Sequence, residues 1–173
     1  FCLSRGLGDV YKRQLLGQLI LKYLPENSKH ILDAGCGTGE NLKYLSQLLP
    51  HIQLEGFDIS TEALKYASKK TSAQTYTGDI CNPPTTKKFD LIYSCDVIYI
   101  PGLKKSLPGL EKLTNSLNPG GILILHLPAL PWLYSQHDVA IHTSQRFYTS
   151  HLKNLCLDLN LQPIVLSLSL IHI

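Results

Sequence analysis

The chain has 173 residues, which is enough for one domain with a full core and too few for two ordinary domains. An apolar content of 44% and a charged content of 17% are typical of a soluble globular protein, and no apolar run approaches the ~18 residues of a membrane span. The formal net charge of +3 mostly disappears when residues 1–14 are set aside, so charge gives no argument for nucleic-acid binding.

The cysteines bear on disulfides and metal binding, and the two ends of the chain bear on the extent of the domain. The five cysteines are scattered without a C-x-x-C pair, which predicts reduced thiols, no disulfide framework and no metal site. Residues 1–14 and 169–173 lack a clean apolar period and resemble translated sequencing-adapter read-through. We therefore expect a single domain over residues 15–168. Nothing resembles a signal peptide, so a cytoplasmic location is expected.

Helical and strand patterns alternate along the chain. Apolar residues at three- and four-residue steps predict a helix over 15–24, followed by a strand over 30–33. Further helices are expected from Leu42 to 49, over 61–70 with Ser60 as its cap, over 103–117 with a kink or late start at Pro108, and around 152–159. Further strands are expected over 52–57, 73–77, 89–95, 122–127 and 162–167. This alternation predicts an α/β fold with a doubly wound, mostly parallel sheet that binds ligands at the carboxyl ends of its strands.

A glycine-rich turn, Asp33-Ala34-Gly35-Cys36-Gly37-Thr38-Gly39, joins the first strand to the next helix. Glycine can adopt positive φ and lets a ligand lie directly against the backbone. A dinucleotide fingerprint requires G-x-G-x-x-G, whereas the third glycine here comes one residue early and Glu40 would repel a pyrophosphate. The turn therefore favours a ligand that has an amino-acid part and a ribose but no phosphate.

The D-x-G-x-G-x-G pattern resembles the first motif of class I S-adenosylmethionine-dependent methyltransferases. Three later stretches continue this resemblance: Asp58 about 20 residues on, Gly78-Asp79-Ile80, and Ser94-Cys95-Asp96. The resemblance implies that Asp58 holds the ribose hydroxyls, that Asp79 and Ile80 bind the adenine, and that residues 94–96 lie by the methionine part and the methyl group. The full set of cofactor-binding residues that it implies is Asp33, Gly35, Cys36, Gly37, Gly39, Asn41, Asp58, Ile59, Asp79, Ile80, Ser94, Cys95 and Asp96.

Two of these acids also have simpler explanations, and the chain departs from the family pattern in two places. Asp58 could be a solvated strand-end acid, and Asp79 could simply form a turn. Family members with Asp-Val-Ile continue with Glu-His, but this chain has Tyr99 and Ile100, so one acid and one base are absent. The family's last antiparallel strand has no sequence left to form it, so we expect a Rossmann-like sheet that lacks this strand and exposes an edge.

Residues 128–149 are too many for an ordinary connection, which predicts a lid or binding loop. The loop is similar to that of bacterial methyltransferases with Pro-Ala, Ser-x-His-Asp and Arg-Arg-Tyr patterns, a subgroup of surface-glycan, lipid or natural-product pathways, although Phe147 replaces one arginine. Exposed or structural roles are the alternatives throughout the loop, and His126 is expected to be a core histidine. The catalytic candidates are His137, Asp138 and His142, with Asp138 able to orient an imidazole, and the substrate-binding candidates are Trp132, Tyr134, Arg146 and Tyr148.

The resemblance implies S-adenosylmethionine as cofactor and methyl transfer to a small-molecule acceptor by in-line displacement, with oxygen favoured over nitrogen or carbon. A general base is needed only if the acceptor must lose a proton. The alternative is a methyltransferase-like fragment that binds the cofactor but is inactive. A nicotinamide dehydrogenase is disfavoured by Glu40 and by the absence of a Tyr-x-x-x-Lys pair. The sequence indicates neither the acceptor nor the oligomeric state.

Overall fold

The computed structural model describes residues 2–140 and 142–167, and the side chains of these residues apart from 2–9 and 137. Among the described residues, no helix is both long and apolar enough to cross a membrane. The elements follow in the order α1 (Cys2–Tyr23), β1 (His30–Ala34), α2 (Glu40–Leu48), β2 (Gln53–Asp58), α3 (Thr61–Lys70), β3 (Gln74–Thr77), β4 (Phe89–Cys95), α4 (Leu103–Asn115), β5 (Leu117–His126), the 3₁₀ turn η1 (Pro131–Leu133), α5 (Gln136–Ala140) and α6 (Thr149–Asp158).

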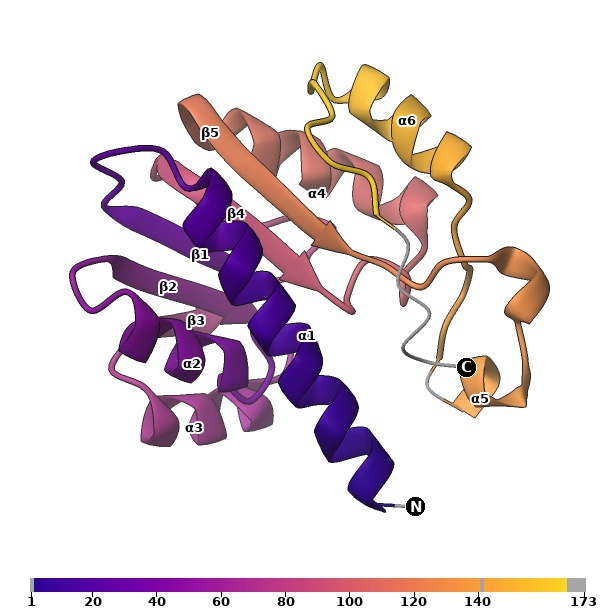
Figure 1. Ribbon diagram of the computed structural model, residues 1–173, viewed down its shortest axis with the longest axis horizontal. Coiled ribbons are helices and arrows are strands. Elements are labelled where there is room, and N and C mark those ends of the chain that lie inside the picture. The colour runs from indigo at the N-terminus through magenta and orange to yellow at the C-terminus, as the bar shows by residue number, and fades with distance from the viewer. Residues whose placement is uncertain (1, 141, 168–173) are drawn as a thin grey trace.

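Within the described residues, five strands form one sheet in the order β3-β2-β1-β4-β5, and every neighbouring pair is parallel. Helices α1, α2 and α3 lie on one side of this sheet, and α4 and α6 lie on the other (Figure 1). The prediction of a doubly wound parallel sheet is therefore confirmed. Because all strands run the same way, their carboxyl ends meet at one edge, where the sequence places its glycine turn and its acids.

Successive residues of the central strands point to opposite faces and bury separate cores. Ile31 packs with Leu16 and Ile20 of α1, whereas Leu32 packs with Leu110 and Leu113 of α4. All of these side chains are buried. The near-continuous apolar sequence of β1 is thus explained by helices on both faces.

Three expectations for the elements were incomplete or wrong. Helix α1 begins at Cys2, well before the predicted residue 15, and helix α4 begins at Leu103 with Pro108 inside it. The strand predicted over 162–167 does not form, and this segment is exposed coil. An apolar run becomes a strand only where a neighbour completes its hydrogen bonds, and none of the described strands pairs with this segment.

Residues 118–121, between the expected helix and the expected strand, lie inside β5 as an irregularity. Phe89 of β4 pairs with Leu117 of β5, but Leu91 pairs with Ile122, so the chain loops out between these two pairs. Asp90 fixes the loop, since its carboxylate accepts hydrogen bonds from the Asn118 side chain and from the backbone of residues 29 and 30. These bonds join β4, β5 and the start of β1 at this end of the sheet, while the functional candidates lie at the other end.

Candidate functional site

The glycine turn has a left-handed backbone at each of its three glycines, with φ of 93° at Gly35, 52° at Gly37 and 79° at Gly39. A Cβ at Gly35 would lie 2.3 Å from Val97 Cγ2, and one at Gly39 would lie 2.9 Å from Ala67 Cβ. At Gly37 a Cβ would meet no atom of the described residues within 4 Å. The turn is therefore packed against the protein at its first and last glycines, and its middle glycine faces open space.

Asp58 at the end of β2 holds this turn in place. Its Oδ2 accepts a hydrogen bond of 2.8 Å from the Gly37 backbone N–H, and its Oδ1 accepts one of 2.8 Å from the Ser60 backbone N–H. A carboxylate has about four lone-pair sites, so both oxygens can accept further bonds from ligand hydroxyls. The predicted partnership between the turn and this acid is present in the structure.

Asp33 is the acid before the turn, and it is only 1% exposed. Its Oδ2 accepts a hydrogen bond of 2.8 Å from the Tyr93 hydroxyl, whereas Oδ1 is buried without a partner among the described residues. Burial raises the pKa of Asp33 to about 7, although the bond from Tyr93 opposes this. A buried oxygen without a partner is costly, so a ligand that donates to it fits this position.

Cys36 and Asn41 lie around the same turn. Cys36 is buried, and burial together with Asp33 and Asp58 raises the pKa of its thiol to about 12. Asn41 is half-buried in the first turn of α2. The thiol is therefore protonated packing around the turn rather than a nucleophile.

The residues predicted to bind adenine divide into two kinds. Asp79 is exposed, and its Oδ1 accepts a hydrogen bond of 2.9 Å from the Cys81 backbone, which is the turn-forming role considered as its alternative. Ile80 was predicted to lie against the ring, but it is buried in the core with Phe57. Ile59, which follows Asp58 directly, is 70% exposed. The exposed apolar surface beside Asp58 therefore comes from Ile59.

The carboxyl end of β4 and the next residue, Asp96, adjoin a charged cluster that the sequence did not reveal. Ser94 is buried and donates to the Ala34 carbonyl oxygen, and burial raises the pKa of the Cys95 thiol. Asp96 accepts from Lys12 Nζ at 3.0 Å and lies 2.9 Å from His126 Nδ1. Burial alone would raise the pKa of Asp96, but the bonds from His126 and Lys12 outweigh it and lower the pKa to about 2.

His126 was expected to be a core histidine, yet its side chain is 34% exposed and is bonded to an acid. It is the last residue of β5 and pairs in register with Cys95, the residue before Asp96. A polar residue at the carboxyl end of an otherwise apolar strand is the signal that could have identified it.

The loop 128–148 is held by an internal ion pair. Asp138 was predicted to orient an imidazole, but its Oδ1 accepts from Arg146 Nε at 2.8 Å and its Oδ2 from the Ser135 backbone at 2.9 Å. Arg146, a substrate candidate, also donates to the Ala129 carbonyl oxygen. Asp138 and Arg146 thus stabilise the loop internally, because the partners of both side chains belong to the loop.

The other loop candidates lie at its surface. Trp132, Tyr134 and Tyr148 are exposed, and the Tyr134 hydroxyl donates to the Thr143 carbonyl oxygen. His142 is exposed in a turn with φ of 58°. The side chain of His137 lies outside the described part of the chain. The loop reaches the carboxyl edge of the sheet where the Ser144 backbone donates a bond of 3.0 Å to the Tyr99 carbonyl oxygen.

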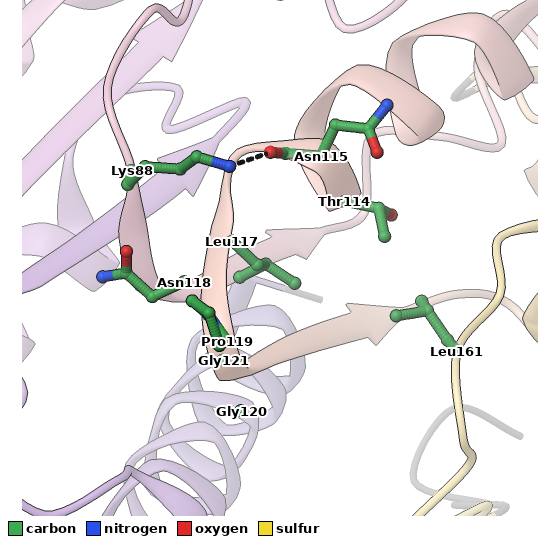
Figure 2. A pocket seen from close by; sticks show the side chains of 9 residues that line it. All are labelled: Lys88, Thr114, Asn115, Leu117, Asn118, Pro119, Gly120, Gly121 and Leu161. Atoms are coloured by element: carbon green, nitrogen blue, oxygen red, sulfur yellow. Dashed lines mark hydrogen bonds between the residues drawn. The ribbon is translucent and has the colours of Figure 1, made fainter.

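A hollow of about 410 Å³ lies at the opposite end of the sheet, around the starts of β4 and β5 (Figure 2). Lys88 crosses it and donates to the Asn115 carbonyl oxygen. Parallel α/β sheets bind ligands at the carboxyl ends of their strands, so this hollow is not the candidate site. Within the described ranges, no cluster of three or more His, Cys, Asp or Glu side chains could hold a metal ion.

Comparison with known proteins identifies the fold and the family. A family model described as "Methyltransferase domain" matches residues 31–121, which include the glycine turn, Asp58 and the segment after β4. The structure of the plantazolicin methyltransferase BpumL in complex with a triazolic desmethylPZN analog and SAH matches with a TM-score of 0.69 and 25% identity, over 88% of this chain and 66% of that one. Magnesium protoporphyrin IX methyltransferase from Synechocystis, also with bound SAH, has a TM-score of 0.69 at 18% identity, over 88% and 73% of the two chains.

Curated relatives match over a shorter region. Trans-aconitate 2-methyltransferase of Escherichia coli O139:H28 is 30% identical over 122 residues, which are 69% of this chain and 47% of that protein. Malonyl-[acyl-carrier protein] O-methyltransferase of Pectobacterium atrosepticum is 34% identical over 111 residues, 62% of this chain and 42% of that protein. The chain thus spans less than half the length of these relatives. It belongs to the methyltransferase domain family and has the fold of class I methyltransferases, whose cofactor is S-adenosylmethionine.

Proposed function

We propose that the chain is the cofactor-binding core of an enzyme that transfers a methyl group from S-adenosylmethionine to an oxygen atom of a small-molecule acceptor. The observation that carries this proposal is the meeting of the open Gly37 backbone, the Asp58 carboxylate and the unpartnered Asp33 Oδ1 at one edge of the sheet, as far as the described residues extend. These groups suit a ligand with hydroxyl and ammonium donors and no phosphate. Asp33, Asp58 and the glycine turn would hold it.

The names of the relatives support the acceptor class. One acts on trans-aconitate, and another is an O-methyltransferase that acts on malonyl groups of an acyl-carrier protein. The first name specifies a small acid, and the second specifies methylation at oxygen. We extend these two properties to this chain as part of the proposal.

The cofactor supplies an electrophilic methyl group, and transfer is an in-line displacement. The main task of the protein is to align donor and acceptor and to exclude water, which can lower the barrier by ~7–11 kcal/mol. Asp58 would fix the ribose end of the cofactor, and the segment after β4 would line the other end. The loop 128–148 is joined to that segment through Ser144 and Tyr99, so it is suited to shape the acceptor side.

A thermal-shift titration with S-adenosylhomocysteine, with NAD as comparison, tests the cofactor. Ligand at 100 times its Kd should stabilise the protein by ~2.7 kcal/mol. The melting temperature should therefore rise with S-adenosylhomocysteine, which is a thioether, and should not rise with NAD. Asp58→Ala should abolish this rise, whereas Glu111→Ala, a matched acid on the exposed face of α4, should leave it unchanged. No rise in the wild type, or an equal rise with NAD, would contradict the proposal.

Cofactor binding without turnover is the second candidate. It is favoured by Tyr99, which stands where family members carry a glutamate and is only 8% exposed. Burial, with Asp96 and Asp138 nearby, raises the pKa of Tyr99 to about 12, so this residue cannot replace a carboxylate base at neutral pH. A rise in melting temperature with S-adenosylhomocysteine, but no formation of this product from S-adenosylmethionine with any acceptor tried, would favour this candidate.

A further inference from the structure

We propose that His126 is the general base of the reaction and that Asp96 positions it, so that the acceptor is a hydroxyl compound. This inference rests on the proposed function and names its acceptor class more closely. The carboxylate of Asp96 can only accept a hydrogen bond, so the contact of 2.9 Å from His126 Nδ1 to Asp96 Oδ1 requires the proton on Nδ1. A neutral ring then presents Nε2 as a proton acceptor.

The position of this pair connects it to the cofactor site. Asp96 directly follows β4 and has a left-handed backbone with φ of 60°, and its N–H donates to the His126 carbonyl oxygen at 3.2 Å. The next residue, Val97, packs against Gly35 of the glycine turn. Asp96 and His126 therefore lie at the carboxyl ends of β4 and β5, and Asp96 is one residue from Val97, which contacts the glycine turn. Strand β4 is also the neighbour of β1, the strand that leads into this turn.

The groups around His126 suit a base. Lys12 on α1 bonds the second oxygen of Asp96, which keeps this carboxylate ionised beside the ring. Cys95 is paired with His126 in register, and its half-buried thiol stays protonated because burial raises its pKa. Tyr99, near Asp96, is protonated as well. The imidazole side chain is one-third exposed, so an acceptor can reach it.

The proposed step transfers one proton to His126 and one methyl group to the acceptor oxygen. The acceptor hydroxyl gives its proton to His126 Nε2 while its oxygen forms a bond to the methyl carbon. The carbon–sulfur bond breaks, and its electron pair stays on the sulfur. The imidazolium is stabilised by Asp96 and releases its proton to solvent. A carboxylate acceptor is already deprotonated at neutral pH and needs no such base.

The first test follows histidine ring signals by NMR in protein with labelled histidine, before and after S-adenosylhomocysteine at a concentration that saturates the thermal shift. The His126 signals should move, whereas those of His30 and His51, at the opposite end of the sheet, should not. In the wild type the neutral ring should carry its proton on Nδ1, and Asp96→Asn should raise the fraction with the proton on Nε2. Unchanged His126 signals in protein that binds S-adenosylhomocysteine would overturn the proposal. This test does not require the acceptor to be known.

The second test compares three acceptors: catechol, which is a phenol; methyl glucoside, which is an alcohol; and trans-aconitate, which is a carboxylate. His126→Gln can still donate to Asp96 but cannot take a proton, so it should lower hydroxyl methylation by about 10²–10⁴-fold and remove the acid limb of the pH–rate profile. The affinity for S-adenosylhomocysteine should stay unchanged, as should every activity of the control His51→Gln. Wild-type rates of hydroxyl methylation in His126→Gln, or methylation of trans-aconitate alone, would overturn the inference. Absence of thioether binding would instead contradict the proposed function.

Discussion

The Tyr93 hydroxyl donates a hydrogen bond of 2.8 Å to Asp33 Oδ2, and the two residues are paired in register on the central strands β4 and β1. Both side chains are buried. The second oxygen of Asp33 has no partner in the described part of the chain. The sheet therefore contains, at the edge where the cofactor is expected, a carboxyl group that these contacts satisfy only in part.

Asp33 should make the protein less stable as the pH rises. The pKa of Asp33 is raised from 3.8 to about 7 in the folded protein, mainly by burial. Between these values the unfolded chain loses the proton that the folded chain keeps, so the free energy of unfolding should fall from pH 4 to pH 7 and then level off. The total fall is on the order of 4 kcal/mol.

Asp33→Asn should remove this dependence. Urea denaturation at pH values from 4 to 8 should show that the variant is more stable than the wild type at pH 7, while S-adenosylhomocysteine titrations should show weaker binding. Tyr93→Phe serves as the comparison, since it removes the donor and should steepen the fall. The same pH slope in wild type and Asp33→Asn would argue against a buried, protonated carboxyl at this position.

Gly37 and Gly120 form a matched pair for testing the open side of the glycine turn. Both have positive φ, 52° and 76°, and a Cβ added at either glycine would meet no atom of the described residues within 4 Å. Alanine at either position should cost about 1–2 kcal/mol of stability through the left-handed backbone. Gly37→Ala alone should also weaken S-adenosylhomocysteine binding by at least about tenfold, because its methyl group would occupy ligand space.

Calorimetric titration of both variants measures this difference. Gly120 lies near the start of β5, far from the carboxyl edge of the sheet, so its variant reports backbone strain alone. Equal loss of affinity in the two variants would mean that strain, and not filled space, causes the effect. Unchanged affinity in Gly37→Ala would place the ligand elsewhere.

Local patterns predicted the fold well, together with the positions of the glycine turn and Asp58 at one edge of the sheet. Strand β4 has the predicted bounds, and Ser60 caps α3 by accepting from the Ala63 backbone at 3.2 Å. The glycine turn and Asp58 also lie together as expected. Each of these features depends on residues close in sequence, or on one strand pairing that the α/β alternation already implies.

Features that depend on tertiary neighbours could not be predicted. His126 and Asp96 are 30 residues apart and meet only because β4 and β5 are adjacent. The run at 162–167 has a strand-like composition but pairs with none of the described strands. The resemblance of Gly78-Asp79-Ile80 to the family suggested a role for Ile80, whereas burial of Ile80 and exposure of Ile59 follow from the packing of the sheet.

Asp138 and Arg146 should act as one structural unit of the loop 128–148. Burial alone would raise the pKa of Asp138, but bonds from Arg146 and Ser135 outweigh it and hold the pKa below its usual value. The stabilisation is therefore present above the unfolded pKa and is lost as the pH falls below about 4. At neutral pH, Asp138→Ala and Arg146→Ala should each lower the free energy of unfolding by about 1–3 kcal/mol.

The double variant distinguishes a structural pair from two independent functional residues. If each side chain serves mainly to satisfy the other, the double substitution should cost no more than the larger single one, which gives a coupling energy of about 1–3 kcal/mol in urea denaturation. His142→Ala, at an exposed turn of the same loop, controls for substitution there and should change the stability by less than about 0.5 kcal/mol. S-adenosylhomocysteine should bind all four variants with similar affinity, because the pair lies outside the glycine turn. Additive losses of stability, or loss of cofactor binding in Arg146→Ala alone, would show that Arg146 has a partner other than Asp138.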